Sequence, residues 1–510
     1  MPQVPNEPLD PDYLAFVARG LGIDTPSDTV RSSVKSSVTD VLDSLAHILI
    51  AKPRQTVAVG AYVPTRADHA ADALIVLIAE NGPPNPETIQ HLQDVLARLR
   101  RIRAAPPPPY LGTTVYGTQI IPSYIPRNAR TAFERELVDL EMAVLTYSHA
   151  KLHRRITKHD CHLAFAEAVG DMCGLPVEDR ADDRDDAERK LLADLQALEV
   201  NRPYLRRLDF CMQKLAAMPP PGSVPDELDI IRTVLHQVLE DKMELAHKST
   251  FLRMLNEYTQ CRLAKKGKQV KKPPDVLQWL SKVITIVEHY HRITRIATIP
   301  TLAGRFLQGL KIEGVPDPVP APLIPRALDR QTARKILEAA DCDLGHDINK
   351  TVDGFLDTLA GAHAGPNAPE VRSADYQPSF HCESALLAQI HGRPAIPYIG
   401  VSKPSCAFCS IFFDAYRAAT SAGNIYTRSG HRQLTSWACP VLHDDPALNA
   451  TIREHVASAL LSKIGSGWKR YRKAPSSSRS LAAAGDDHDR ILADDEVRLD
   501  IAGLELKPKG

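Results

Sequence analysis

The stretch "SFHCESALLAQIHGRPAIPYIGVSKPSCAFCSIFF", residues 379–413, places a His, a Glu and two closely spaced Cys inside a strongly apolar segment. Together with the residues that follow it, the stretch predicts a helix at 383–392, a buried strand at 396–402, a helix at 406–423 and a strand at 424–429. A helix-strand-helix-strand order is typical of an α/β layer with some parallel pairing.

Four side chains in this stretch form two short motifs. His381 and Glu383 form an H-x-E at the start of the first helix, and Cys406 and Cys409 form a C-x-x-C at the start of the second. One imidazole and two thiolates supply the three protein ligands that a catalytic zinc ion needs beside its open position. Residues three apart on a helix share a face, and a helix N-terminus favours the thiolate form of Cys. The sequence therefore predicts Zn²⁺ bound by His381, Cys406 and Cys409.

Glu383 is better suited to act as a base than as a fourth ligand. It would take a proton from a water at the metal and pass protons to a ring nitrogen and to the leaving amine. This chemistry is the hydrolytic deamination of an amino-purine or amino-pyrimidine.

Other interpretations of the two motifs stay open. The His can be a capping residue, the Glu a surface residue and the two Cys ordinary buried apolar residues. The site can also hold a structural zinc ion without turnover. A redox C-x-x-C of the thioredoxin type is a weaker alternative, because it leaves the H-x-E without a role.

The motifs resemble those of a known superfamily. "HCE" followed by "YIGVSKPSCAFC" resembles the cytidine-deaminase superfamily, whose signature is H-x-E with a downstream P-C-x-x-C. More narrowly, "HCESALL", "IGVSKPSCAFCSIFF" and "TRSGHRQLTSWACP" resemble a little-characterised deaminase-like family that is expanded in fungi, over residues 375–440. The resemblance implies zinc-dependent deamination of a nucleobase, in a nucleotide or nucleic acid, by a three-layer α/β domain. Upstream of His381 no hairpin for the first two strands of that fold is evident, so we expect the sheet to be reduced or built from 373–380, "SADYQPSF".

A polar loop follows the second predicted strand and is expected to lie over the pocket. In this loop Arg428 would hold a phosphate or carboxylate, His431 would hydrogen-bond a base, and Trp437 would stack on it. Alternatively, Trp437 belongs to the core and the polar pair is solvated.

A basic run near the C-terminus predicts contact with single-stranded nucleic acid. Lys469, Arg470 and Arg472 alternate with Trp468 and Tyr471, so phosphates would meet the charges while bases stack. A solvated run of charges at a domain edge is the more common outcome for such a pattern.

Histidines also cluster in "SHAKLHRRITKHDCHLAF", residues 148–165, where a second metal site is one interpretation. The pattern favours a basic helical face, because no carboxylate or Cys partner is arranged as in a known site. His289 and His291 have the same status.

Composition limits the class of protein. The 510 residues include 62 Lys and Arg and 62 Asp and Glu, so no global basic field favours nucleic acid. Nine Cys are few and odd in number, which argues against a secreted disulfide scaffold. The most apolar windows are too short to span a bilayer, and we expect a soluble, intracellular protein without a membrane partner, in the cytoplasm or nucleus.

The domain organisation follows from proline runs and helical periodicity. Apolar residues recur at helical spacing through roughly the first 325 residues, where we expect helical bundles able to bind a protein partner. The expected fold class is α+β, a mostly helical N-terminal region followed by the three-layer domain. The expected segments are a helical segment at 1–105, a helical bundle at 106–325, connecting helices at 326–364, the deaminase-like domain at 365–475 and a flexible tail at 476–510. The rival function is a non-enzymatic helical interaction protein with a degenerate or structural zinc module.

Overall fold

The computed structural model describes residues 9–21, 37–53, 55–64, 74–106, 130–173, 184–218, 225–246, 249–265, 276–316, 324–325, 328–363, 375–376, 378–420, 424–428, 435–442 and 445–473. These residues form two compact units, and each unit draws on separated stretches of the chain. The first unit takes the described residues within 1–46, 56–89 and 309–491, and the second takes those within 47–55 and 90–308.

The first unit is built around a five-stranded mixed sheet with the order β3-β2-β1-β6-β7. Its strands are β1 (Val57–Tyr62), β2 (Ile75–Glu80), β3 (Lys311–Gly314), β6 (Tyr398–Val401) and β7 (Tyr426–Thr427). β1 is antiparallel to both of its neighbours, while β2 pairs with β3 and β6 pairs with β7 in parallel. A separate pair, β4 (Ile324–Pro325) and β5 (Asp375–Tyr376), is antiparallel.

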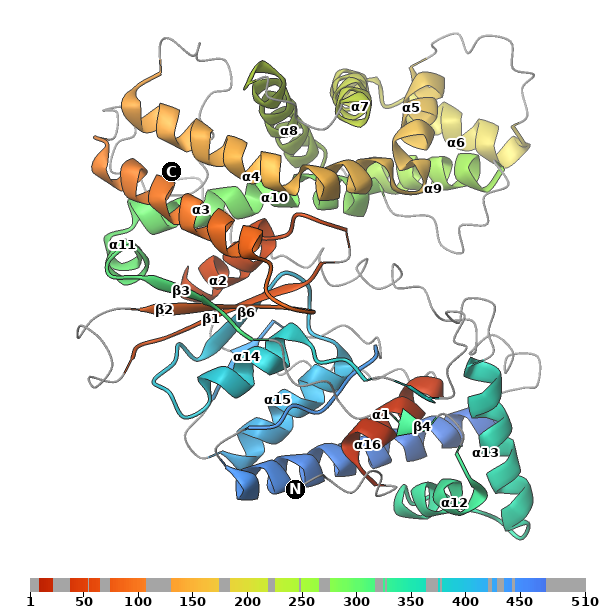
Figure 1. Cartoon of the computed structure of the whole chain (residues 1–510). Helices are drawn as coiled ribbons and strands as arrows, with labels where there is room; N and C mark the ends of the chain where they lie inside the picture. The colour runs from red at the N-terminus through yellow and green to blue at the C-terminus, as the bar shows by residue number, and fades with distance from the viewer. Residues whose placement is uncertain are drawn as a thin grey trace, which may run out of the picture. The chain divides into compact units, whose positions relative to one another are not determined.

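Helices cover both faces of this sheet, and two glycines allow them to approach closely. A Cβ on Gly400 in β6 would lie 2.2 Å from the backbone carbon of Leu42 in α2 (Ser37–Ile48). A Cβ on Gly60 in β1 would lie 2.4 Å from Leu386 in α14 (Cys382–Ile390). Gly400 pairs with Val59, and paired residues face the same side of a sheet. Gly60, the next residue along β1, therefore faces the opposite side. The sheet is therefore the middle of three layers, with α2 on one face and α14 on the other (Figure 1).

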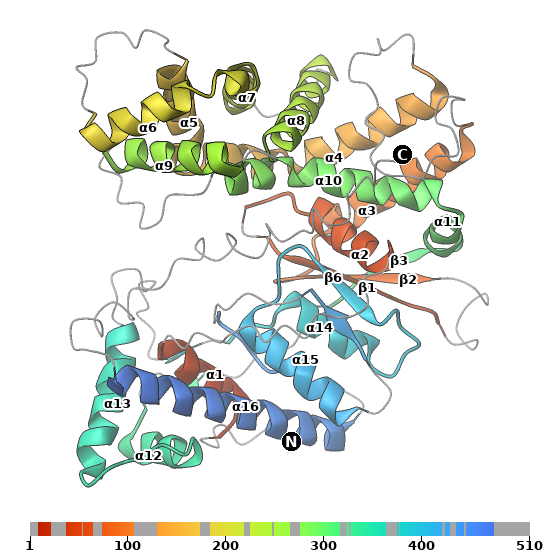
Figure 2. The same ribbon diagram turned by 180° about the vertical axis from the view of Figure 1, so that it is seen from behind.

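The face that carries α14 also holds the main core of the first unit. Buried residues of β1, β2, β6 and α14 join those of α15 (Ala407–Ala419) in one apolar cluster. The cluster continues into α1 (Pro11–Gly20), α12 (Arg330–Ala339), α13 (Ile348–His363) and α16 (Pro446–Lys473). α1 and α16 lie side by side in Figures 1 and 2.

In the second unit helices predominate. Its elements are most of α3 (Pro86–Ala104), then α4 (Ala132–Thr157), the short 3₁₀ turns Lys158–Asp160 and Glu199–Asn201, α5 (Cys161–Met172), α6 (Asp186–Gln196), α7 (Arg202–Ala217), α8 (Pro225–Ala246), α9 (Ser249–Lys265), α10 (Val276–Thr298) and α11 (Pro300–Phe306). α4, α8 and α10 pack against one another (Figure 2).

Buried polar side chains lie between α4, α8 and α10. Glu141 of α4 accepts a hydrogen bond from His236 of α8 at 2.7 Å, and Arg232 lies 3.8 Å from the other oxygen of the same carboxylate. The ring of His291 on α10 meets that of His236 edge-on. Burial lowers the pKa of His291 to about 4. The carboxylate of Glu141 partly opposes this shift, and the neighbouring His236 adds to it. Burial likewise lowers the pKa of His91, whose ring stacks on Tyr147, to about 4.

The expected fold class, α+β with a helical N-terminal region, is confirmed. The helix, strand, helix and strand predicted between 383 and 429 are present as α14, β6, α15 and β7, with the expected parallel pairing of β6 and β7.

Two expectations about the sheet are wrong. The first 325 residues are not helical throughout, because β1, β2 and β3 lie within them. The hairpin that seemed missing upstream of His381 is formed by β1 and β2, whereas Asp375–Tyr376 pairs only with β4. Local pattern could not reveal this, since the hairpin is separated from the rest of the sheet by the whole helical unit.

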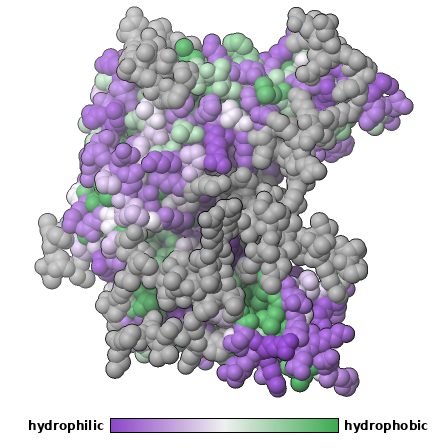
Figure 3. Space-filling model, turned by 45° about the vertical axis from the view of Figure 1, so that its right-hand side comes forward, coloured by the Kyte–Doolittle hydropathy of each residue, from purple (hydrophilic) through white to green (hydrophobic). Residues whose placement is uncertain are grey.

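The expected domain boundaries are consecutive along the chain, whereas the two compact units interleave. The tail expected at 476–510 lies outside the described residues. Among the helices that the structure describes, none is both long enough and apolar enough to cross a membrane. On the face drawn in Figure 3, hydrophilic residues predominate among the coloured atoms.

Replacing Gly400 should destabilise the first unit, because its Cβ would collide with the backbone of α2 rather than with a movable side chain. We expect Gly400→Ala to cost about 1–3 kcal/mol and to lower the melting temperature of that unit in calorimetry. Gly354→Ala on α13 is the matched control, since a Cβ there meets nothing within 4 Å and Ala favours a helix. Equal melting temperatures for the two variants would contradict the three-layer packing.

The stability of the helical unit should fall in acid. A His whose folded pKa is lowered binds protons more readily when unfolded, so the stabilisation present above about pH 6.5 is lost as the pH falls toward 4. We expect the melting temperature, followed by circular dichroism, to drop between pH 7 and pH 5. His91→Phe should flatten this dependence, whereas substitution of the exposed His346 by Gln should leave it unchanged.

Candidate metal centre

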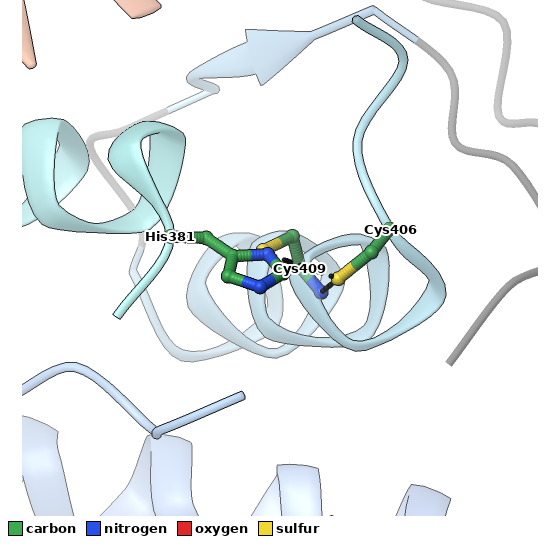
Figure 4. A group of neighbouring side chains, drawn as sticks. All are labelled: His381, Cys406 and Cys409. Atoms are coloured by element: carbon green, nitrogen blue, oxygen red, sulfur yellow. Dashed lines mark hydrogen bonds between the residues drawn. The ribbon is translucent and has the colours of Figure 1, made fainter. Parts of the chain in front are cut away.

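The N-terminal ends of two helices bring the expected ligands together. His381 is the residue before the first turn of α14, and Cys406 holds the same position before α15. Cys409 lies in the first turn of α15, and its backbone N–H donates to the Cys406 sulfur at 3.4 Å. Only residues 402–405 separate Cys406 from the end of β6, so the sheet limits where α15 can begin. The three side chains point toward one another (Figure 4).

The distances among these side chains suit a single metal ion. His381 Nδ1 lies 3.3 Å from the sulfur of Cys406 and 3.3 Å from the sulfur of Cys409. All three candidate ligand atoms lie within 4.8 Å of one another. Tetrahedral zinc with Zn–S of about 2.3 Å and Zn–N of about 2.0–2.1 Å would place nitrogen and sulfur roughly 3.5 Å apart. The residues therefore fit a metal ion, as expected for such a site.

The imidazole of His381 is oriented by the chain that follows β7. Its Nε2 lies 2.8 Å from the carbonyl oxygen of Ser436 and 3.3 Å from the hydroxyl of Thr435. A hydrogen bond from Nε2–H to a carbonyl directs Nδ1 at the two sulfurs, where its lone pair would face a bound metal. The Ser379 hydroxyl donates to the same carbonyl at 2.8 Å, and Ala438 N–H donates to the Ser379 carbonyl. These contacts fix the tautomer that a metal requires.

Because His381 directs its ring at the sulfurs, it does not cap α14 with its side chain. The cap comes instead from Asn81, directly after β2, whose Oδ1 accepts a hydrogen bond from Cys382 N–H at 3.0 Å. A capping side chain satisfies a backbone donor that a helix start leaves unpaired. The β1–β2 hairpin thereby supports the helix that carries both His381 and Glu383.

Glu383 lies beside the three ligands in the first turn of α14 and is 4 % exposed. Its Oε2 is 3.4 Å from the sulfur of Cys382, and its charge acts on both His381 and Cys409, raising the pKa of each. The carboxylate is therefore within reach of the ligand cluster while the three candidate ligand atoms remain the His nitrogen and the two sulfurs.

The protonation states of the three ligands are strongly coupled. Burial opposes a thiolate at Cys406, but its hydrogen bonds with Cys409 and His381 and the His381 charge hold its pKa well below the usual range. Burial also opposes an imidazolium, but the Cys406 charge raises the pKa of His381 to about 9. Burial and the neighbouring Cys406 raise the pKa of Cys409 well above its usual range. These shifts favour an imidazolium–thiolate pair of His381 and Cys406 beside a neutral Cys409 thiol.

Arg428 lies at the same edge of the sheet as the metal centre. β6 and β7 are parallel, so their carboxyl ends share an edge, and Cys406 and Arg428 each follow one of these ends. The hydroxyls of Ser405 and Thr427 approach to 3.4 Å and link the two chain segments. Arg428 also acts electrostatically on the buried carboxylate of Asp43, opposing the rise that burial gives its pKa.

The other two residues expected to bind substrate have different outcomes. Trp437 is buried and packs against Phe408 and Phe412, which agrees with the core alternative, and its role in stacking stays a prediction. His431 lies outside the described residues.

The basic run at the end of α16 is exposed, whereas its two aromatic residues pack against other rings of the first unit. Trp468 is buried edge-on to Phe355, and Tyr471 stacks on Trp468. Lys469, Arg470 and Arg472 lie on the surface, and Arg472 donates to the carbonyl of Asp343 at 2.9 Å. Contact of these three with nucleic acid stays a prediction.

Within the described part of the chain, the only group arranged as metal ligands is His381, Cys406 and Cys409. The histidines near the end of α4 do not form a second group there. His149 and His153 stack on each other, and His153 Nε2 lies 3.2 Å from the carbonyl of Ala216.

Sequence reasoning did not find Ser436 and Asn81, the residues that orient His381 and cap α14. The sequence carries one local signal for Asn81. It forms an Asn-Gly pair directly after the apolar run of β2, and such a pair is typical of a turn at the end of a strand. Ser436 carries none, since it acts through its backbone carbonyl.

Metal binding should strengthen steeply with pH. Below about pH 9, both His381 and Cys409 hold a proton that the metal must displace, so about two protons leave on binding. We expect the apparent affinity for Co²⁺ or Zn²⁺, measured by competition with a chelator, to rise roughly 100-fold per pH unit between pH 6 and pH 8. An affinity independent of pH would contradict the protonation states described above.

Comparison with known proteins finds a family match for one part of the chain. Residues 380–441 match the model of a family described as "OTT_1508_deam:-like deaminase". Neither the curated proteins nor the solved structures include a significant match. The resemblance to a deaminase family is therefore confirmed over these residues, and the narrower expectation of a family expanded in fungi stays a prediction. Over residues 380–441, which include all three candidate ligands and Glu383, the chain is similar to a deaminase.

Proposed function

We propose that the protein is a zinc-dependent hydrolytic deaminase that removes an exocyclic amine from a nucleobase, in a nucleotide or nucleic acid. The observation that carries the proposal is the convergence of His381 Nδ1 with the sulfurs of Cys406 and Cys409, with Glu383 beside them. The match to a deaminase family over the same residues supports it.

His381, Cys406 and Cys409 would hold the zinc ion and leave one position open. A zinc ion bound in this way makes a water at its open position more acidic. Zinc suits this ligand set, since two soft thiolates and one imidazole are typical of zinc sites. The carbonyl of Ser436 keeps the imidazole in the orientation that a ligand needs.

The role of Glu383 is to move protons. It takes a proton from the attacking water as the water oxygen bonds to the amidine carbon of the base. It gives this proton to the ring nitrogen. It then takes the second proton from the new hydroxyl and gives it to the amine, so that the C–N bond breaks, ammonia leaves and a carbonyl remains. The burial of Glu383 excludes bulk water from these transfers.

Two further roles belong to the proposal. Arg428 would bind a phosphate or carboxylate of the substrate, a role supported by its place at the sheet edge beside Cys406. For a polymeric substrate, Lys469, Arg470 and Arg472 would contact phosphates, a role supported by their exposure at the end of α16.

Glu383→Gln should separate catalysis from metal binding. We expect this variant to keep about one zinc per chain, because none of the three ligands changes, and to lose ammonia release by roughly 10²–10⁴-fold, because the proton shuttle is gone. Zinc would be measured by elemental analysis and ammonia by a coupled assay on cytosine- and adenine-containing substrates. Cys406→Ser should lose both zinc and activity.

Glu338→Gln on the exposed face of α12 is the matched control, and it should leave both quantities unchanged. Zinc retained by an inactive wild type, with no effect of Glu383→Gln, would favour the rival, a structural zinc module in an interaction protein. A wild type without zinc, from a preparation never exposed to chelator, would overturn the proposal.

A further inference from the structure

A small basic pocket lies in the helical unit, between α3 and α11. It has a volume of about 180 Å³ and is lined by Arg100, Arg103, Pro300, Ala303, Gly304, Leu307 and Gln308. Among the described residues, its lining contains two arginines and no acidic residue, so none of these lining residues neutralises the positive charge. None of the residues discussed for the deaminase site takes part in it.

The two guanidinium groups are held in place by backbone carbonyls rather than by carboxylates. Arg100 Nε donates to the carbonyl of Leu307 at 3.0 Å, and Arg103 Nη1 donates to the carbonyl of Ala297 at 3.4 Å. Within the described part of the chain, these bonds leave both Nη groups of Arg100 and one Nη of Arg103 for another acceptor. Arginines are well suited to bind phosphate oxygens, and orienting them in advance reduces the entropy lost on binding.

The neighbouring Arg101 shows how a neutralised arginine differs. Its Nε lies 2.9 Å from Glu136, so its charge is already paired, and it does not line the pocket. All three side chains are exposed on the same stretch of α3. Arg100 and Arg103 thus differ from Arg101 in lining the pocket and in bonding to carbonyls instead of a carboxylate.

We propose that this pocket binds a phosphate group through the side chains of Arg100 and Arg103. The volume is below the roughly 300–1,000 Å³ of sites that take whole drug-sized ligands, so it suits a single phosphate rather than an entire nucleotide. The phosphate can belong to a free phosphorylated small molecule or to the backbone of a nucleic acid. The inference does not depend on the deaminase chemistry.

Gly304 provides a way to block the pocket without touching its charges. It lines the pocket, and a Cβ built on it meets nothing within 4 Å. A leucine there would fill the pocket, while leucine is favourable within α11. Loss of binding in Gly304→Leu would therefore not arise from broken arginine contacts.

The test measures inorganic phosphate binding to the full chain by calorimetry at low, fixed salt. We expect the double variant Arg100→Gln/Arg103→Gln and the single variant Gly304→Leu to weaken binding by about tenfold or more, as the loss of charge-assisted hydrogen bonds implies. Arg101→Gln, the matched control, should change it less than about twofold, because Glu136 already neutralises that arginine. Melting temperatures of all variants would verify that they are folded.

A second titration with a labelled single-stranded DNA oligonucleotide distinguishes the two sources of phosphate. If the same variants weaken oligonucleotide binding in parallel, the phosphate belongs to a nucleic acid backbone. If they weaken phosphate binding alone, it belongs to a phosphorylated small molecule. No phosphate binding by the wild type, or an equal loss in Arg101→Gln, would overturn the proposal.

Discussion

The pairing of β1 with β6 is the interaction on which the rest of the first unit depends. Val57 N–H donates to the hydroxyl of Ser402, and Ser402 N–H donates to the carbonyl of Val57, across 345 positions of sequence. Cys406 follows β6 after the short segment 402–405, while α14 packs through Leu386 against Gly60 of β1. One strand pair thereby fixes both helix starts that form the candidate metal centre.

That metal centre also imposes a requirement on the helices. Each of two ligands, His381 and Cys406, stands where a helix usually has a capping side chain. Cys406 meets both needs, because its sulfur accepts from Cys409 N–H, whereas His381 does not. Asn81 supplies the missing cap from another strand. A ligand at a helix start therefore needs support from the sheet, and that support links the site to residues far away in the sequence.

The local part of the fold and the ligand types could be predicted from the sequence. α14, β6, α15 and β7 follow from apolar runs bounded by Gly and Pro, and His381, Cys406 and Cys409 from residue type and spacing. The strands β1 and β2 could not, because both are almost entirely buried and show no alternation of polar and apolar residues. Their other partners in the sheet follow the helical unit in the sequence, so a local pattern carries no information about this pairing. Contacts made through backbone carbonyls, such as that of Ser436, leave no trace in residue type.

The interleaving of the two units has a consequence for synthesis. β1 and β2 leave the ribosome with 345 positions between Val57 and its partner Ser402, a delay of roughly 20 to 70 s at ordinary rates of translation. During that time the edge of β1 that will pair with β6 has no partner from this sheet, while the complete helical unit has already emerged and can fold. An unpaired apolar strand edge is a target for wrong pairing. The interleaved order therefore exposes this edge to wrong pairing until the residues of β6, which ends at Val401, have been made.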